Sequence, residues 1–364
     1  MIRFIQSKIK QLVWLFVLSL AVSFGNAQVR KYSNEFLAIG VGARSMALSK
    51  ATVATVNDVT SGYWNPAGLA GLKKDYAVGL MHSEYFAGIA KYDYAAFATK
   101  IDDQSSVGFS YIRFGVDDIP NTIDLVDQNG NVNYDNIASF AAVDNAFILS
   151  YARSLPVEGL TIGGSAKVIY RKVGDFAQAW GFGLDAGAQY LYKKWHFGAT
   201  LRDVTSTFNA WSYSLNQRTI EVFEQTNNEI PENGLEITLP RLILGAGRLF
   251  KVKKFGVQPE VNIDITTDGQ RNTLIQSDPF SIDPYMGLEL SWNEIVYLRS
   301  GLGNFQKIQA EVGSHKVTTF EPNIGIGLSF KGVSIDYALT DIGDNSVALY
   351  SNVFSLKIDF NKPK

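Results

Sequence analysis

A regular alternation of apolar and polar residues limits most strongly what this chain can fold into. In residues 255–265, Val261 and Ile263 fall on one face of a period-two pattern, and Glu260 falls on the other. Successive side chains of a β-strand point to opposite faces, so such a segment has one apolar and one polar face. The pattern recurs in residues 160–171, 284–292 and 350–361. Strands that separate lipid from a polar lumen are built in this way.

Fourteen segments of this kind follow one another along the chain. We expect strands at residues 74–82, 91–101, 104–114, 143–155, 158–172, 178–192, 194–204, 239–252, 254–266, 283–293, 294–303, 319–330, 332–339 and 349–361. An even number of strands is typical of single-chain bacterial barrels whose two ends lie on one side of the membrane. The lipid-facing residues are expected to include Val261, Ile263, Leu288 and Leu290.

The connections between these segments alternate in length. The even-numbered ones are tight turns at Asp102-Asp103, Pro156-Val157, Lys193, Lys253, Asn293-Glu294 and Lys331-Gly332. The odd-numbered ones are mostly longer: residues 83–90, 115–142, 173–177, 205–238, 267–282, 304–318 and 340–348. Outer-membrane barrels have short periplasmic turns and longer extracellular loops, whereas a soluble β-sandwich has no reason to alternate them. We predict an all-β, transmembrane antiparallel barrel of about fourteen strands in a Gram-negative outer membrane, with both termini periplasmic.

The N-terminus carries the features of a secretory signal peptide. Arg3, Lys8 and Lys10 precede the apolar run 12–24, and small residues follow up to Ala27. A membrane-spanning helix needs about 20 apolar residues, which this run does not reach. We expect cleavage after Ala27. Loss of the three basic residues would lower the net charge from −2 to −5.

Composition excludes several classes of function. A mildly acidic chain lacks the basic surface that nucleic acid requires, and a chain without cysteine can form neither disulfides nor thiolate metal sites. His82, His196 and His315 show no metal-ligand spacing, and no Gly-x-Ser-x-Gly motif accompanies them. We therefore predict a protein for binding or transport, not an enzyme, with no cofactor and no metal.

Residues 28–73 differ from the strand segments that follow them. They are rich in glycine and other small residues, and their apolar spacing suits short helices better than strands. A fourteen-strand barrel leaves a lumen that its own side chains do not fill. We expect residues 1–27 to be the signal peptide, residues 28–73 to form a hatch of short helices inside the lumen, and residues 74–364 to form the barrel.

Two elements of the 28–73 segment resemble a known family. The residues that carry the resemblance are Gly42, Ala43, Arg44, Trp64, Asn65, Pro66, Ala67 and Gly68. In this order and spacing they resemble the FadL-like outer-membrane barrel superfamily and, within it, the PorV/PorQ family of Bacteroidetes. Apart from the family, Pro66 keeps Asn65 out of the helical region, and Gly68 is expected to let the chain reverse. A generic helix-ending turn would use the same residues.

The resemblance implies a fourteen-stranded barrel with the N-terminal segment as a hatch inside it. PorV-type members serve the type IX secretion system. They bind the translocon or the C-terminal signal domain of secreted cargo and carry it toward surface attachment. FadL-type members take up hydrophobic small molecules through the lumen. The hatch motif does not separate the branches, so a PorV-like partner-binding barrel and a FadL-like transporter both remain as hypotheses.

Two long connections are candidates for recognition. Residues 205–238 mix Phe208, Trp211, Tyr213 and Phe223 with asparagine and glutamine, a blend common at binding surfaces. We therefore propose this connection, together with residues 115–142, as the partner-binding surface.

The connection 115–142 also invites a calcium interpretation. Asp124 is followed by oxygen ligands at every second position from Asp127 to Asp135. Compared with an EF-hand loop, however, its glycine comes too early and no glutamate closes it. Asn129-Gly130 is a strong hairpin signal. A hairpin is the favoured interpretation, and calcium binding stays open.

Charged residues on the predicted lumen face are Lys167, Arg171, Glu260, Asp264, Glu289, Asp336, Lys357 and Asp359. They could bind a charged solute, but an unpaired buried charge is costly, so pairing with one another or with the hatch fits better. Arg44 of the hatch is a natural partner for one of the carboxylates. Trp195 and Trp292 lie beside short turns, where an interfacial aromatic girdle is expected.

Overall fold

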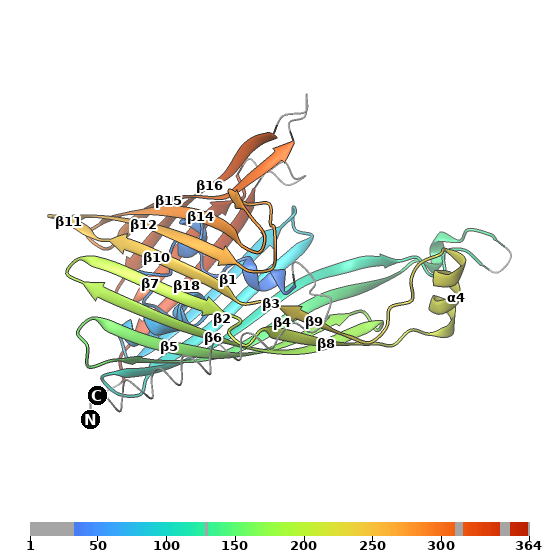
Figure 1. Ribbon diagram of the computed structural model, residues 1–364, viewed down its shortest axis with the longest axis horizontal. Helices are drawn as coiled ribbons and strands as arrows, with labels where there is room; N and C mark the ends of the chain where they lie inside the picture. Colours follow the sequence, from blue (N-terminus) through green and yellow to red (C-terminus); the bar gives the residue numbers. More distant parts are fainter. Residues whose placement is uncertain (1–32, 128–129, 310–315, 343–349, 363–364) are drawn as a thin grey trace.

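The computed structural model describes residues 33–127, 130–309, 316–342 and 350–362, and it shows a closed antiparallel barrel (Figure 1). Closure is made by β1 (Tyr76–Tyr85), which pairs with β2 (Ala90–Lys100) on one side and with β18 (Ser351–Phe360) on the other. The predicted signal peptide lies outside the described residues. Among the residues that are described, no helix has the length and apolar character needed to cross a membrane.

The wall consists of fourteen strands, as predicted. The other strand elements are β3 (Ser105–Asn121), β4 (Ala138–Ser154), β5 (Leu160–Val173), β6 (Ala177–Tyr192), β7 (Trp195–Arg202), β8 (Thr207–Tyr213), β9 (Gly234–Thr238), β10 (Arg241–Arg248), β11 (Phe250–Val252), β12 (Phe255–Thr266), β13 (Ile275–Gln276), β14 (Ser281–Trp292), β15 (Val296–Gln309), β16 (Lys316–Phe330) and β17 (Val333–Thr340). Because β6 pairs with both β7 and β8, these two elements act as one wall strand. β9, β10 and β11 likewise form one strand, and β13 is a two-residue addition beside β14.

The tight turns lie where the sequence predicts them, at one end of the barrel. The other end carries the odd-numbered connections and is called the outer end. Here the predicted loops are wrong in extent. β3 and β4 remain paired as far as Asn121 and Ala138, so much of residues 115–142 is strand. Residues 205–238 contain β8, β9 and the helix α4 (Gln217–Gln225). Strand pairing satisfies backbone hydrogen-bonding groups within the chain, which a long bare loop would leave to water.

The two faces of the wall are those that the alternation predicts. Val261, Ile263, Leu288 and Leu290 are exposed on the outer face, and Glu289 between the last two is buried on the inner face. Exposed aromatic rings also gather at the short-turn end, where Trp195 and Trp292 lie next to turns and Phe255 is directly opposite Trp292. This placement fits the predicted girdle.

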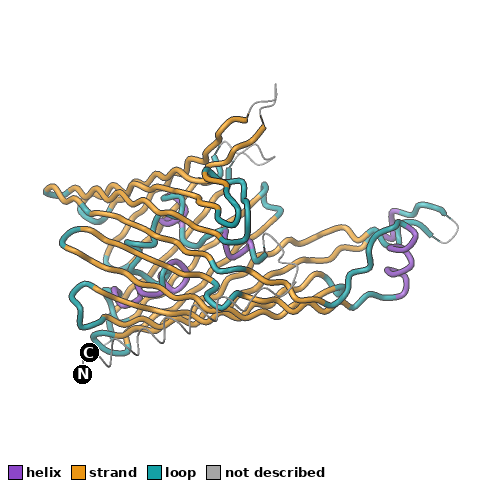
Figure 2. Tube along the Cα trace, in the orientation of Figure 1, coloured by secondary structure: helices purple, strands orange, loops and turns teal. Residues whose placement is uncertain are grey.

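Short helices of the N-terminal segment occupy the lumen, as Figures 1 and 2 show. They are η1 (Glu35–Ala38), α2 (Ala43–Ala47), α3 (Ser61–Trp64) and η2 (Pro66–Gly71), and a further turn, η3 (Tyr134–Asn136), lies in the β3–β4 connection. Val41, Val56 and Leu69 of this segment share one core with the inward-facing wall residues Ile112 and Ile169. The described residues 33–72 thus form the predicted hatch.

Inward-facing glycines of the wall leave room for the hatch backbone. A Cβ atom on Gly301 of β15 would lie 2.3 Å from the carbonyl carbon of Leu48 and 2.4 Å from the nitrogen of Ser49. A Cβ atom on Gly163 of β5 would lie 2.5 Å from the carbonyl carbon of Pro66. Because these neighbours are backbone atoms, they cannot move aside as a side-chain tip can. The wall and the hatch therefore have matching shapes at these two strands.

We expect Gly301→Ala to destabilise the folded barrel by about 1–3 kcal/mol, because overpacking forces the hatch away from β15. Urea unfolding of the protein in lipid vesicles measures the change. Gly164→Ala is the control, since a Cβ atom there would meet its nearest neighbour, the carbonyl oxygen of Asp185, at 3.5 Å. Equal stability of the two variants would show that the hatch is not seated against β15.

Candidate functional site: hatch, vestibule and outer arm

A chain of ion pairs ties the hatch to one side of the wall. Arg44 Nε lies 2.8 Å from Glu289 Oε2 on β14, which confirms the predicted pairing of Arg44 with a lumen carboxylate. Arg299 Nε of β15 lies 2.7 Å from the same oxygen, and Arg299 Nη1 lies 2.7 Å from Asp336 Oδ1 on β17. All three wall residues are buried.

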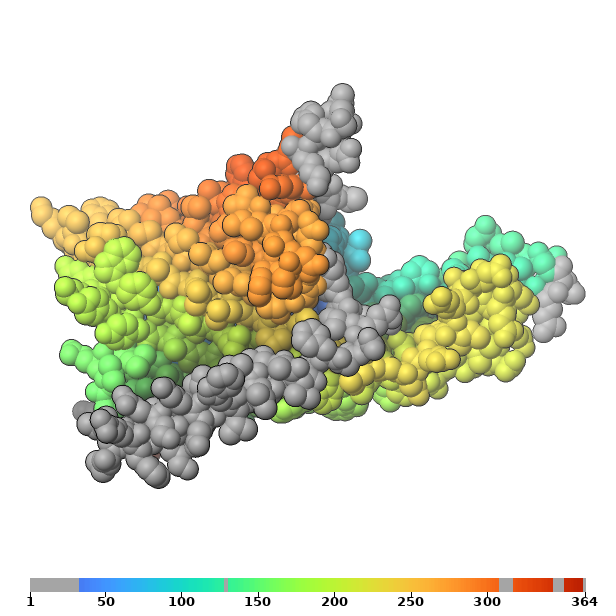
Figure 3. Space-filling model, in the orientation of Figure 1, coloured from blue at the N-terminus to red at the C-terminus, as the bar shows by residue number. Residues whose placement is uncertain are grey.

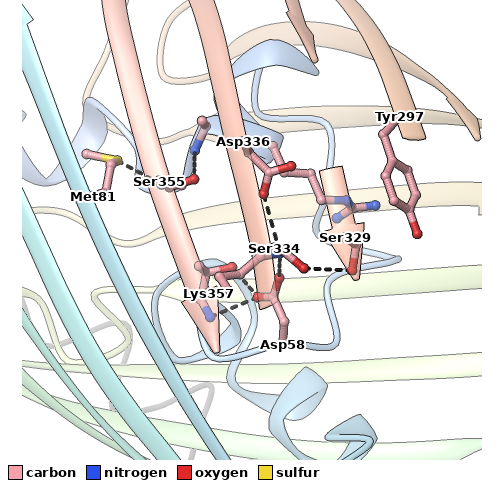
Figure 4. A network of polar contacts seen from close by, with 12 residues as sticks. Asp58, Met81, Tyr297, Ser329, Ser334, Asp336, Ser355 and Lys357 are labelled. Carbon is pink, nitrogen blue, oxygen red and sulfur yellow. Dashed lines mark hydrogen bonds and ion pairs between the residues drawn. The ribbon is translucent and has the colours of Figure 1, made fainter. Parts of the chain in front are cut away.

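The chain continues to a second point on the hatch. Lys357 Nζ of β18 lies 2.6 Å from Asp58 Oδ2 and 3.9 Å from Asp336 Oδ2, and Figure 4 shows these side chains pointing toward one another. Burial would raise the pKa of the Asp58 carboxyl, but Lys357 and a hydrogen bond from Thr60 hold that pKa well below its usual range. We call the six residues Arg44, Asp58, Glu289, Arg299, Asp336 and Lys357 the latch. It joins two places on the hatch to four wall strands.

Most other predicted lumen charges are also compensated. Lys167 Nζ lies 2.7 Å from Asp185 Oδ1 and 2.6 Å from Asp203 Oδ1. Arg171 pairs with Asp144 and Glu236, Arg241 pairs with Asp264, and Glu260 accepts hydrogen bonds from the Ala54 nitrogen and the Thr55 hydroxyl of the hatch. Asp359 lies on the inner face of β18. The ion pairs join residues of the barrel to one another, and Glu260 joins the wall to the hatch, which fits the predicted pairing better than solute binding.

The residues of the resemblance motif fix the fold of the hatch. Trp64 Nε1 donates to the Val41 carbonyl oxygen at 2.9 Å. Asn65 is fully buried, and its Nδ2 donates to the carbonyl oxygens of Val53 at 2.9 Å and Ala188 at 3.0 Å. Asn65 therefore joins two parts of the hatch to wall strand β6. A generic helix-ending turn would not require an asparagine with these two bonds.

The expected role of Gly68 is wrong. Gly68 is not among the described residues with positive φ, so it does not provide a left-handed chain reversal. A Cβ atom there would lie 2.3 Å from the Val56 carbonyl oxygen. Glycine is required for close packing within the hatch. Gly42, which precedes α2, does have a positive φ of 81°.

Above the hatch, the outer half of the lumen contains a cavity of about 600 Å³, called the vestibule. Its floor includes Lys50 and Trp64 of the hatch, and Phe86 and Gln306 belong to its outer rim. Charged groups lie around it on several strands: Arg202, Arg241, Asp264, Asp283, Glu321 and Asp341. Charged groups therefore line part of the space that a solute would enter from the outer end.

Beyond the vestibule, the wall extends into an outer arm, which consists of the outer ends of β3, β4, β5 and β6 together with η3, β8, α4 and β9. Figures 1 and 3 show it projecting far beyond the rest of the barrel, with α4 beside the β3–β4 connection. Arg218 of α4 donates to the Val126 carbonyl oxygen at 2.7 Å and lies 3.5 Å from Asp124 Oδ1. The two predicted recognition segments are thus in contact.

The arm presents apolar side chains that sequence reasoning missed. Tyr134 is 74% exposed and Val132 is 54% exposed, and Val126, Ile230 and Leu235 are also exposed. The predicted residues contribute less surface. Phe208 is exposed, whereas Trp211, Tyr213 and Phe223 are half-buried. Trp211 Nε1 donates to Glu236 at 2.6 Å, and its ring lies under Arg171. Tyr134 is so exposed because of its place in the β3–β4 connection, which the amino-acid composition of that segment does not indicate.

The β3–β4 connection forms a hairpin as predicted, although Asn129 of the predicted turn falls outside the described residues. Val126 pairs with Val132, and both carboxylate oxygens of Asp127 accept hydrogen bonds from Asn131. Within the described parts of the chain, no group of three or more acidic, histidine or cysteine side chains could hold a metal ion. His82 Nδ1 lies 2.7 Å from Asp93 Oδ1 on the outer face, His196 lies in β7, and His315 falls outside the described residues.

Comparison with protein families gives a match in the N-terminal part of the chain. A family model described as "Type IX secretion system protein PorV" matches residues 25–200. The resemblance to the PorV family is confirmed. The PorV match includes the hatch, the resemblance motif and strands β1 to β6. Comparison with curated protein sequences gives no significant match.

Solved structures confirm the FadL-like fold. The Pseudomonas putida toluene transporter TodX is 13% identical, with a TM-score of 0.56, and the match covers 89% of this chain and 99% of that one. The CymD monoaromatic hydrocarbon channel is also 13% identical, with a TM-score of 0.55 over 89% and 98% of the two chains. The Ralstonia pickettii toluene transporter TbuX is 14% identical, with a TM-score of 0.54 over 88% and 98%. At these identities the likeness concerns the fold alone. This PorV-like chain is an outer-membrane barrel.

Proposed function

We propose that this protein is a PorV-like component of a type IX secretion system that binds a protein partner through its outer arm. The partner is the translocon or the C-terminal signal domain of secreted cargo, and the role is binding for export and surface attachment, not catalysis. The observation that carries the proposal is the exposed apolar surface on the arm, where α4 and the β3–β4 hairpin meet. The PorV family match supports the choice of partner.

Two features of the structure support binding at the arm over diffusion through the lumen. The hatch occupies the lumen below the vestibule, and the latch holds it at Arg44 and Asp58. By contrast, Tyr134 and Leu235 lie exposed on the arm, which projects from the outer end of the barrel (Figure 1). Exposed aromatic and apolar residues surrounded by polar ones are typical of protein-binding surfaces. Inside the arm, the guanidinium of Arg171 packs over the ring of Trp211.

We expect Tyr134→Ala to weaken binding of a purified cargo C-terminal domain by about tenfold, because a central aromatic residue contributes much of the energy of an interface. Biolayer interferometry on the protein in nanodiscs measures the dissociation constant. Val252→Ala is the matched control, since Val252 is 68% exposed but lies at the short-turn end. Replacing residues 214–233 by a short turn should abolish capture. Undiminished capture by that variant would rule out the arm as the binding surface.

The alternative is a FadL-like transporter for hydrophobic small molecules. It is favoured by the likeness in fold to the CymD monoaromatic hydrocarbon channel and the toluene transporter TodX, and by the vestibule above the hatch. The charged lining of the vestibule makes it a poor site for an apolar solute. Saturable uptake of radiolabelled toluene into vesicles that contain the protein, beyond that of empty vesicles, would favour the transporter.

A further inference from the structure

Two aspartates of the vestibule wall face each other on neighbouring strands. Asp264 of β12 is directly opposite Asp283 of β14, and both side chains line the vestibule. Like charges at opposed positions destabilise a sheet unless a cation compensates them. Arg241 compensates only part of this charge, since its Nη1 lies 3.3 Å from Asp264 Oδ2. Asp283 itself forms no ion pair among the described residues, although Lys50 and Arg202 also line the cavity.

Three buried oxygen atoms at this place have no hydrogen-bond partner among the described residues. They are Asp264 Oδ1, Asp283 Oδ1 and Thr266 Oγ1. Thr266 is 8% exposed and lines the same cavity as the two aspartates. Buried polar atoms of native proteins are almost always hydrogen-bonded, so a cluster without partners indicates a binding group that completes it.

We propose that the vestibule binds the ammonium or guanidinium group of a ligand between Asp264 and Asp283, with Thr266 as a further acceptor. Such groups carry positive charge and several N–H donors, which the three free oxygens require. A metal ion fits less well, because the described chain gathers no three metal-ligating side chains there. The cavity of about 600 Å³ is large enough for a basic side chain with part of its peptide backbone.

The position of the site fits a basic peptide segment that enters from outside. The aspartates lie near the outer ends of their strands, and the vestibule reaches the β12–β14 connection at Asn272 and the outer part of β15 at Gln306. The hatch closes the cavity from below with Lys50 and Trp64, so the peptide is held and does not pass through. This site lies in the lumen, enclosed by the wall, and it does not depend on what the outer arm binds.

Isothermal titration of the mature protein in detergent with acetyl-Gly-Lys-Gly-amide tests the proposal. We expect saturable binding, and at least tenfold weaker binding of the same peptide with an acetylated lysine, which lacks the charge. Asp283→Asn should weaken binding at least tenfold, and so should Asp264→Asn. Glu294→Gln is the control, because Glu294 is an exposed carboxylate at the short-turn end that pairs with Lys251. A heat-modifiable band on electrophoresis shows that each variant has folded.

Thr266→Val serves as a further variant if Asp264→Asn does not fold after Arg241 loses its partner, and we expect it to weaken binding measurably. The proposal would be overturned by an absence of saturable binding to the unaltered protein, by equal affinity for the acetylated peptide, or by unchanged affinity of folded Asp283→Asn. The variant with residues 214–233 replaced should keep full affinity for the peptide. Peptide binding by this variant shows whether the vestibule site is independent of the binding surface on the arm.

Discussion

Arg299→Met is expected to destabilise the folded barrel by about 3–5 kcal/mol, because it leaves two buried carboxylates without their shared partner. Arg299 lies 2.7 Å from both Glu289 Oε2 and Asp336 Oδ1, and the side chain of Asp336 is only 3% exposed. Arg44 remains beside Glu289, but Asp336 is left with Lys357 at 3.9 Å. Urea unfolding in lipid vesicles gives the free energy, and trypsin cleavage after Arg44 or Lys50 reports release of the hatch.

The control for this variant is Lys251→Met. Lys251 Nζ lies 2.5 Å from Glu294 Oε1, but the side chains are 57% and 61% exposed. Such an exposed pair contributes about 0–1 kcal/mol, since water and salt screen it. If the two variants lose the same stability, the latch does not hold the hatch and the argument from buried charge fails.

Leu288→Arg is expected to cost about 2–4 kcal/mol, because it places a charged side chain on the lipid-facing surface near the middle of a strand. Leu288 is exposed on the outer face of β14, opposite Pro259 of β12 and Ser300 of β15. The same substitution at Phe255, beside a short turn and opposite Trp292, should cost about 0–1 kcal/mol, because the side chain reaches the interface there. Folding yields into vesicles and urea unfolding measure both.

The contradicting result is a reversal of these two effects. If Leu288→Arg folds normally while Phe255→Arg does not, the lipid band does not lie where the alternation places it. Leu288→Ala separates the effect of charge from that of lost apolar surface, and it should cost less than the arginine variant.

Much of the architecture follows from local patterns. Period-two alternation assigns each residue to a face, so the sequence identifies Glu289 as inward and Leu288 as outward without any knowledge of the neighbouring strands. A tight turn also fixes register. The turn at Asn293-Glu294 brings Glu289 opposite Arg299, a pair that counting back from the turn could have found. The even strand number and the girdle follow from the same local rules.

The extent of the outer arm does not follow from such rules. Residues 115–142 and 205–238 have too few regular alternations to mark them as strand, yet β3 continues to Asn121 and β8 and β9 continue the wall. Their pairing depends on partners that are distant in the sequence, as in the pair of β6 with β8. For the same reason, the exposure of Tyr134 could not be predicted from composition.

The sequence by itself determined the barrel, the faces of its strands, the hatch segment and the motif residues, because each of these depends on neighbours a few positions away. Only the tertiary structure decided which lumen charges meet. Arg44 lies 245 positions from Glu289, and the path of the hatch brings these two residues together. Likewise, Gly301 is required only where Leu48 approaches it. Contacts across a lumen depend on the folded path of both chain segments, and no local pattern records that path.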